Sequence, residues 1–263
     1  EGKFWRRRAR DQERITAKNA GKKDREKGGD TLGETLKAAF LTLGCKVNQY
    51  ETDAMRELLE TAGYDIVDFK DPADVYIINT CSVTNMADRK SRQMIHRARK
   101  HNPDAVIVAA GCYVQSAEEE LKAKETADVL IGNNKKKDIV RILDEYFKKR
   151  EKTSEVLDIS ATKEYESLTI HKVSEHTRAY IKIQDGCNQF CSYCIIPYTR
   201  GRIRSKRPEE VIREIRTLAE KGYREVVLTG IHLSSYGMDF EGEKNVNLLS
   251  IIQKVQKIDG IDR

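Results

Sequence analysis

The chain has 263 residues and a formal net charge of +6, with 39% hydrophobic and 34% charged residues. This length suffices for two domains with buried cores, and the composition is typical of a water-soluble globular protein. No apolar run approaches the ~18 residues of a membrane span, and no apolar stretch follows the charged N-terminus as in a signal peptide. We therefore expect a cytoplasmic protein without a membrane segment.

The positive charge is concentrated at the N-terminus. Residues 1–30 contain eleven Lys or Arg and six acidic residues, a balance of +5, which leaves only +1 for the other 233 residues. The segment has several glycines and almost no apolar periodicity, so we predict that residues 1–36 form a disordered basic tail. Such a tail could bind RNA or simply be solvated, and the net charge of the chain does not decide between these.

From residue 37 onward, strand-like and helix-like patterns alternate. Short apolar runs alternate with segments in which apolar residues recur at helical spacing. These segments predict helices near residues 54–62, 87–98, 117–124 and 139–149. The alternation indicates an α/β domain with a mainly parallel, doubly wound sheet at residues 37–150. The apolar runs predicted as its buried strands are Ala38–Leu43, Val75–Ile78, Ala105–Ala110 and Val129–Ile131.

A second alternating block follows a polar segment, residues 151–175, which we interpret as a linker with one strand at most. Strands are predicted at Ala179–Ile183 and Glu225–Leu228, and helices at Pro208–Lys221 and Leu248–Ile258. These two βα units predict the beginning of a barrel at residues 176–263. With so few units, we expect this part to be loosely packed.

Three of the six cysteines form a C-x3-C-x2-C motif, Cys187, Cys191 and Cys194, in a loop just after a predicted strand. Three thiolates can hold three irons of a [4Fe–4S] cluster and leave the fourth iron open to a small ligand. Zinc is the alternative, but it prefers four ligands and would need a partner such as His176. Disulfides are rare in the cytoplasm and would leave one thiol of the trio unpaired.

The other three cysteines, Cys45, Cys81 and Cys112, each follow a different predicted strand. The carboxyl ends of parallel strands meet at one edge of the sheet, where open α/β folds bind ligands. A glycine precedes Cys45 and Cys112 and would allow a tight turn. This placement predicts a second cluster, with three unrelated buried thiols as the alternative.

Four segments contain the six cysteines: TLGCKVNQYETD, INTCSVTNMADRKSRQ, AAGCYVQ and DGCNQFCSYCIIPYTRGRIRSKRPEEV. With them, residues 38–263 closely resemble the radical-SAM methylthiotransferase family. The resemblance implies a flavodoxin-like domain followed by a radical-SAM barrel, which is incomplete here. It also implies two [4Fe–4S] clusters and S-adenosylmethionine (SAM) as cofactors. Cys45, Cys81 and Cys112 would hold an auxiliary cluster for sulfur insertion, and Cys187, Cys191 and Cys194 the cluster that cleaves SAM.

The same resemblance implies which other residues lie near SAM. They are Tyr193, before the third cysteine of the motif, Arg200 and Arg202 in TRGRIRS, and Gly230 after the second barrel strand. Together with Arg204, Lys206 and Arg207, the two arginines form a basic run that could also neutralise tRNA phosphates. The basic face of residues 89–100 could act similarly or be merely solvated.

The motifs GCKVNQYE and LTGIHLSSYG resemble the branch of the family that modifies threonylcarbamoyladenosine beside the anticodon of tRNA. The partners implied are tRNA and an electron donor such as flavodoxin or ferredoxin. The alternatives are the same chemistry on isopentenyladenosine or on a ribosomal aspartate, and a non-catalytic zinc-containing RNA-binding module. Because the barrel is incomplete and the family's terminal RNA-binding domain is missing, we expect this chain by itself to be inactive.

Overall fold

The computed structural model describes residues 35–171, 178–243 and 245–263, and residues 35–263 form one unit. Within the described ranges, no helix is both long enough and apolar enough to cross a membrane. The predicted basic tail lies almost wholly outside these ranges, as does His176, the zinc partner considered above.

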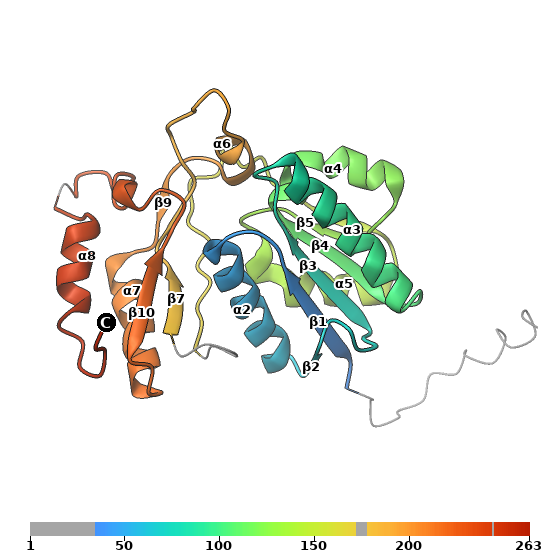
Figure 1. Ribbon diagram of the computed structural model, residues 1–263, viewed down its shortest axis with the longest axis horizontal. Helices are drawn as coiled ribbons and strands as arrows, with labels where there is room; N and C mark the ends of the chain where they lie inside the picture. Colours follow the sequence, from blue (N-terminus) through green and yellow to red (C-terminus); the bar gives the residue numbers. More distant parts are fainter. Residues whose placement is uncertain (1–34, 172–177, 244) are drawn as a thin grey trace, which may run out of the picture. The chain divides into compact units, whose positions relative to one another are not determined.

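A six-stranded parallel sheet dominates the first half of the chain (Figure 1). The strand order is β2-β1-β3-β4-β5-β6, in which the chain reverses its direction of winding between β1 and β3. This order is that of flavodoxin-like folds and confirms the predicted fold class. The strands are β1 (Lys37–Thr42), β2 (Asp65–Val67), β3 (Val75–Thr80), β4 (Val106–Gly111), β5 (Val129–Ile131) and β6 (Thr153–Glu155).

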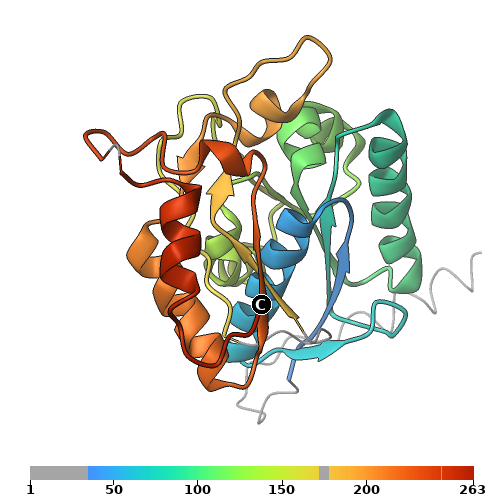
Figure 2. The same ribbon diagram turned by 60° about the vertical axis from the view of Figure 1, so that its left-hand side comes forward.

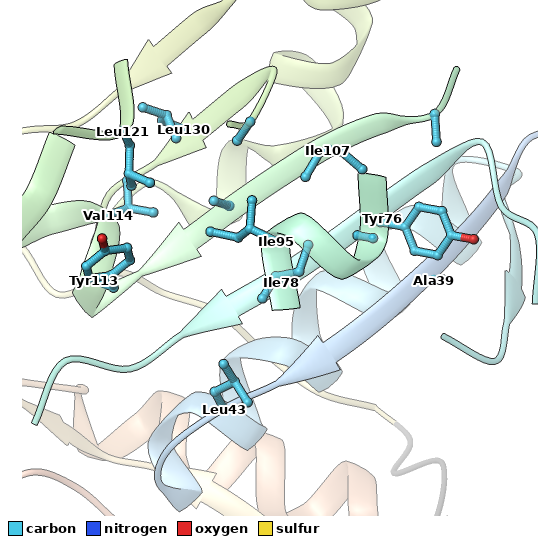
Figure 3. Close-up of a cluster of buried hydrophobic side chains, with 14 of the residues drawn as sticks. Ala39, Leu43, Tyr76, Ile78, Ile95, Ile107, Tyr113, Val114, Leu121 and Leu130 are labelled. Atoms are coloured by element: carbon cyan, nitrogen blue, oxygen red, sulfur yellow. The ribbon is translucent and has the colours of Figure 1, made fainter. Parts of the chain in front are cut away.

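Helices cover both faces of this sheet because successive strand residues point to opposite sides. Ile78 and its equivalents on other strands pack under α3 (Asn85–His101) and α4 (Cys112–Lys124), as Figure 3 shows. Ile77 and its equivalents pack under α2 (Lys46–Thr61) and α5 (Ile139–Lys149), which a short 3-10 helix, η1 (Lys136–Asp138), precedes. Both layers are therefore buried, as the apolar strands predicted.

The sheet extends beyond residue 150, where the sequence placed its end. The edge strand β6 pairs in parallel with β5 and lies in the segment predicted as a linker. Residues 156–171, the remainder of this segment that the structure describes, are also anchored, because Ile159, Leu168 and Ile170 are buried.

The second half begins with two parallel strands, β7 (Arg178–Lys182) and β10 (Glu225–Thr229), as predicted for the start of a barrel. Between them lie α6 (Ile196–Arg200), α7 (Pro208–Glu220) and a small antiparallel pair of strands, β8 (Gln184–Asp185) and β9 (Arg204–Ser205). After β10 come η2 (Leu233–Ser235) and α8 (Leu248–Val255), and α8 packs on α7 (Figure 2).

The second half is well packed, so the expectation of loose packing was wrong. Ile181 of β7 and Ile215 of α7 are fully buried in a core that also contains Tyr50 and Ala54 of α2. The opposite side of α2 contributes Met55 to the core of the sheet. The reason for the difference is that α2 supplies part of the cover that further barrel units would otherwise have to provide.

Candidate functional site

The first three cysteines lie at the carboxyl ends of neighbouring strands. Cys45 directly precedes α2, Cys81 directly follows β3, and Cys112 is the first residue of α4 after β4. The ends of β1 and β3 flank the point where the strand order reverses, which is the usual ligand site of such sheets. The structure therefore brings this trio to the edge of the sheet that the sequence predicted.

The backbone around this trio is tightly packed. Gly44 has a φ of +101°, and a Cβ atom there would lie 2.9 Å from the Sγ atom of Cys81. Burial raises the pKa of the Cys81 thiol, and the neighbouring Cys112 and Cys45 raise it further. Cys112 and Cys45 are thus near enough to influence the ionisation of Cys81.

The second trio lies in the loop that connects β8 to α6. Cys187 and Cys194 are half-buried and Cys191 is exposed. The Cys187 amide donates to the Gly201 carbonyl at 3.0 Å, and the Cys194 amide donates to the Cys191 carbonyl at 2.9 Å. Gly186, which precedes Cys187, has a φ of +70°, and a Cβ atom there would collide with the carbonyl of Arg202.

All six cysteines are free thiols. Within the described ranges, no three His, Cys, Asp or Glu side chains are arranged around one point as ligands of a single metal ion. The donor set nevertheless fits two iron–sulfur clusters, because each site offers three cysteines, and thiolate sulfur is the soft ligand that such clusters take. The division of roles between the two trios stays a prediction.

The basic run after the second trio is mostly buried, which corrects its interpretation as an RNA-binding surface. Arg200, Arg204 and Lys206 are each only 1% exposed and bond to other protein groups. Arg202 lies over the Phe190 ring at 4.3 Å, and Arg207 forms an exposed ion pair with Glu243. Burying a charge requires a nearby partner, and the chain supplies these partners itself.

Glu51 of α2 is at the centre of the largest buried ion network. It forms ion pairs with Lys136, with Lys182 at 2.8 Å and with Arg200 at 2.8 Å. Burial alone would raise the pKa of the Glu51 carboxyl, but these three cations hold it well below its ordinary value. Lys182 and Arg200 also pair with Asp185, whose pKa is likewise lowered despite its burial.

Two buried asparagines that the sequence did not single out lie beside the first trio. The Asn48 side chain donates to the carbonyls of Leu43 at 2.7 Å and Thr80 at 2.9 Å. The Asn133 side chain donates to the Thr199 carbonyl at 2.7 Å, and its nitrogen lies 3.6 Å from the Cys112 sulfur. The position of Asn48, one helical turn after Cys45, was the available signal.

The remaining residues predicted near SAM, Tyr193 and Gly230, lie in two different loops, and their role stays a prediction. Tyr193 is 90% exposed, so it does not pack against the described residues as a core side chain would. Gly230 follows β10, and a Cβ atom there would lie 2.9 Å from the side-chain oxygen of Gln184. That oxygen also accepts from the His232 amide at 2.7 Å, so a side chain at position 230 would disturb this turn.

Two family models match the chain. Residues 37–132 match the uncharacterized protein family UPF0004, and residues 181–258 match the radical SAM superfamily. The first match covers all three cysteines of the first trio, and the second covers the whole C-x3-C-x2-C motif.

Curated relatives match across both regions. The chain is 44% identical over 227 residues to the threonylcarbamoyladenosine tRNA methylthiotransferase MtaB of Aquifex aeolicus, covering 86% of this chain and 54% of that protein. It is 36% identical to the tRNA-2-methylthio-N(6)-dimethylallyladenosine synthase of Carboxydothermus hydrogenoformans, covering 85% of this chain and 51% of that protein. The chain thus spans about half the length of these relatives.

Solved structures confirm the fold. The radical S-adenosylmethionine methyltransferase TsrM of Kitasatospora setae, with cobalamin and a [4Fe-4S] cluster bound, aligns with a TM-score of 0.56 at 10% identity. The alignment covers 84% of this chain and 52% of that one.

The two matched domains, in this order and with these relatives, show that the chain belongs to the radical-SAM methylthiotransferase family, on the branch of the proteins named MtaB.

Proposed function

We propose that the protein to which this chain belongs adds a methylthio group to threonylcarbamoyladenosine beside the anticodon of tRNA. The observation that carries this proposal is the pair of cysteine trios, the first at the carboxyl ends of three neighbouring parallel strands and the second in the loop between β8 and α6. The relative at 44% identity, named for this reaction, supports the choice of nucleoside.

Each trio would hold one [4Fe–4S] cluster and leave one iron without a protein ligand. Cys45, Cys81 and Cys112 would bind the auxiliary cluster, and Cys187, Cys191 and Cys194 the cluster that binds SAM. With SAM, these groups supply the radical and the sulfur chemistry. The protein around them supplies a fixed position and a buried environment, which tune such clusters.

A SAM carboxylate near the second trio needs a cationic partner. Arg204 is suited to this role because its Nε and Nη1 atoms are buried and have no hydrogen-bond partner among the described residues. The other arginine buried in this run, Arg200, bonds to Glu51, Asp185 and Asn48. We therefore assign the carboxylate contact to Arg204. Arg202 is near Arg204 in the sequence, and Gly230 is near it in the fold.

The outer face of α3 offers a surface for tRNA phosphates. Arg89, Lys90, Arg97 and Lys100 are exposed on this helix, and none of them forms an ion pair with a described residue. The helix begins four residues after Cys81, so its N-terminal end is close in sequence to the first trio. A flavodoxin- or ferredoxin-type protein would supply electrons to the clusters.

The proposal is tested by mass spectrometry of tRNA nucleosides from cells that lack the complete gene. Loss of 2-methylthio-threonylcarbamoyladenosine, with recovery when the gene is returned, is the expected result. Selective loss of the methylthio group from isopentenyladenosine would move the protein to the other tRNA branch. Unchanged tRNA nucleosides would refute the proposed function.

Cluster content is tested separately on this chain after anaerobic reconstitution. Replacing Cys187, Cys191 and Cys194 by Ala should remove about half of the bound iron, because each trio holds a cluster of its own. The measurement is iron and sulfide per chain. Loss of all iron would show that both trios serve a single site, and a protein that takes up zinc instead of iron would point to the non-catalytic alternative.

A further inference from the structure

Arg200 contacts the supporting groups of both cysteine trios. It is the last residue of α6, which begins two residues after Cys194, and its side chain is almost completely buried. One guanidinium nitrogen, Nη2, donates to the Asn48 side-chain oxygen at 2.5 Å. The other, Nη1, donates to both carboxylate oxygens of Asp185 at 3.1 Å.

On the side of the first trio, Asn48 fixes the backbone that leads into two cysteines. Its side-chain nitrogen, Nδ2, donates to the backbone carbonyl of Leu43, two residues before Cys45, and to that of Thr80, directly before Cys81. The amide nitrogen of Asn79 in turn donates to the backbone carbonyl of Asn48 at 3.0 Å. Asn48 therefore links the ends of β1 and β3, and it has no charge of its own.

Thr199, the neighbour of Arg200, connects α6 to the surroundings of Cys112, the third cysteine of this trio. The carbonyl of Thr199 accepts a hydrogen bond from Asn133, whose nitrogen lies near the sulfur of Cys112. The side-chain oxygen of Asn133 accepts from Lys136 at 2.7 Å, and Lys136 pairs with Glu51. The end of α6 is thereby connected to the surroundings of all three cysteines.

On the side of the second trio, Asp185 fixes the start of the cysteine loop. Its carboxylate accepts from the amide of Gly186 at 2.8 Å, directly before Cys187. The amide of Cys187 bonds to the carbonyl of Gly201, directly after Arg200. Both bonds hold Cys187 against the segment that carries the guanidinium group.

We infer that Arg200 is a positioning residue that fixes the two cysteine trios relative to each other, through Asn48 on one side and Asp185 on the other. This inference rests on the proposed function, because it requires a cluster at each trio. Arg200 thereby acts through its neighbours and not as a contact for RNA phosphates. Its planar, forked guanidinium suits this role, since it can bond to Asn48 and Asp185 at the same time.

The charge of Arg200 has a second effect on the first trio. The guanidinium group stays charged, as arginine does in proteins, and it forms ion pairs with Glu51 and Asp185. A fixed positive charge near a cluster stabilises its reduced, more negative state, and second-sphere charge is one determinant of cluster potential. Removing the charge should therefore make the cluster of the first trio harder to reduce.

The test compares N48A, R200K and R200M with R207M, in which an exposed arginine of the same run is replaced. All are made in this chain and reconstituted anaerobically, with and without the triple alanine replacement of the second trio. N48A should weaken retention of the first cluster against a chelator by about 10- to 100-fold, the usual effect of losing a group that supports metal ligands. It should leave the second cluster as in the unmodified chain.

R200M should shift the midpoint potential of the first cluster to a more negative value, as measured by EPR-monitored titration in the triple-alanine background. R200K keeps the charge and should retain the potential while still weakening cluster retention, because a lysine cannot bond to both sides. R207M should change neither quantity. Circular dichroism and urea unfolding identify variants that do not fold, and N48A and R200K then carry the test.

Equal cluster retention and potential in N48A, R200M and R207M, all folded, would overturn the inference and leave Arg200 as an ordinary buried ion-pair residue. Failure of the unmodified chain to bind any iron would instead refute the proposed function, and the inference with it. The two failures are therefore distinguishable in one set of preparations.

Discussion

Glu51 shows how strongly individual residues depend on partners that are distant in sequence. Its three cations come from η1, β7 and α6, and all four side chains are almost completely buried. Removing one member of such a group leaves charges buried without compensation, which typically costs about 3–5 kcal/mol. The sequence contained Glu51 within a recognisable motif, but nothing in the pattern predicted its burial, because burial depends on how the second half packs.

We expect E51Q to lower the free energy of unfolding of the metal-free chain at pH 7 by about 3–5 kcal/mol. The pKa of Glu51 is lowered in the folded state, so its contribution is fully present above its ordinary value of 4.5 and is lost as pH falls further. The unmodified chain should therefore lose more stability than E51Q between about pH 5 and pH 3. Urea unfolding at several pH values measures both effects.

E243Q is the matched control, because Glu243 forms an ion pair that is about half exposed. Such exposed pairs contribute little, roughly 0–1 kcal/mol. Parallel stability curves for E51Q and the unmodified chain across this pH range would show that folding does not lower the pKa of Glu51.

At the scale of secondary structure, the long apolar elements were predictable and the short polar ones were not. β3 and β4 consist of six fully buried residues each, so their sequences alone indicated strands. β2 and β6 have only three residues each and are not fully buried. They are strands because β1 and β5 offer them free edges, a condition that a local pattern does not contain.

The edge strand β6 leads to a prediction about fragments. A fragment of residues 35–150 should have a lower urea midpoint than one of residues 35–171, because β5 would be left as an unpaired buried edge. It would also lose Leu168 and Ile170, which cover Tyr50 and Ala54 of α2. A fragment of residues 35–156, which restores β6 alone, should be intermediate, and equal midpoints for all three would contradict this account.

The basic face of α3 leads to a prediction about RNA binding. The double variant R89E/K90E should weaken binding of tRNA and reduce the slope of log affinity against log salt by roughly 1.5–2, if each residue neutralises one phosphate. Fluorescence anisotropy with labelled tRNA at several salt concentrations measures both quantities. K148E/K149E makes the same charge change on the exposed end of α5 and should have a smaller effect. Equal effects would mean that only net charge matters.

On the scale of the whole molecule, α2 belongs to two cores at once. Met55 and Leu59 pack under the sheet, while Tyr50 and Ala54 pack against the second half of the chain. The Tyr50 hydroxyl also lies within hydrogen-bond distance of two acceptors, the Leu168 carbonyl at 2.6 Å and the Glu214 carboxylate at 2.9 Å. The family and the positions of the cysteines could be predicted from the sequence, but this shared helix could not, because its two faces are not distinguished by residue type.

Because of this shared helix, the two halves should unfold together. I215A creates a cavity only in the second core and should cost about 2–5 kcal/mol. Hydrogen exchange followed by mass spectrometry at increasing urea should then show earlier opening of β3 and of α7 alike. A shift confined to peptides from α7 would show that the halves unfold independently.

The bond between Asn48 and Arg200 joins residues 152 positions apart, which has a consequence during synthesis of the chain. At about 5–20 residues per second, the ribosome adds Arg200 roughly 8–30 seconds after Asn48. For the later part of that interval Cys45, Cys81 and Cys112 already exist, but the guanidinium group that bonds to Asn48 does not. A cluster inserted before Arg200 is added would therefore enter an unsupported site, so we expect iron delivery to the first trio to follow synthesis of Arg200.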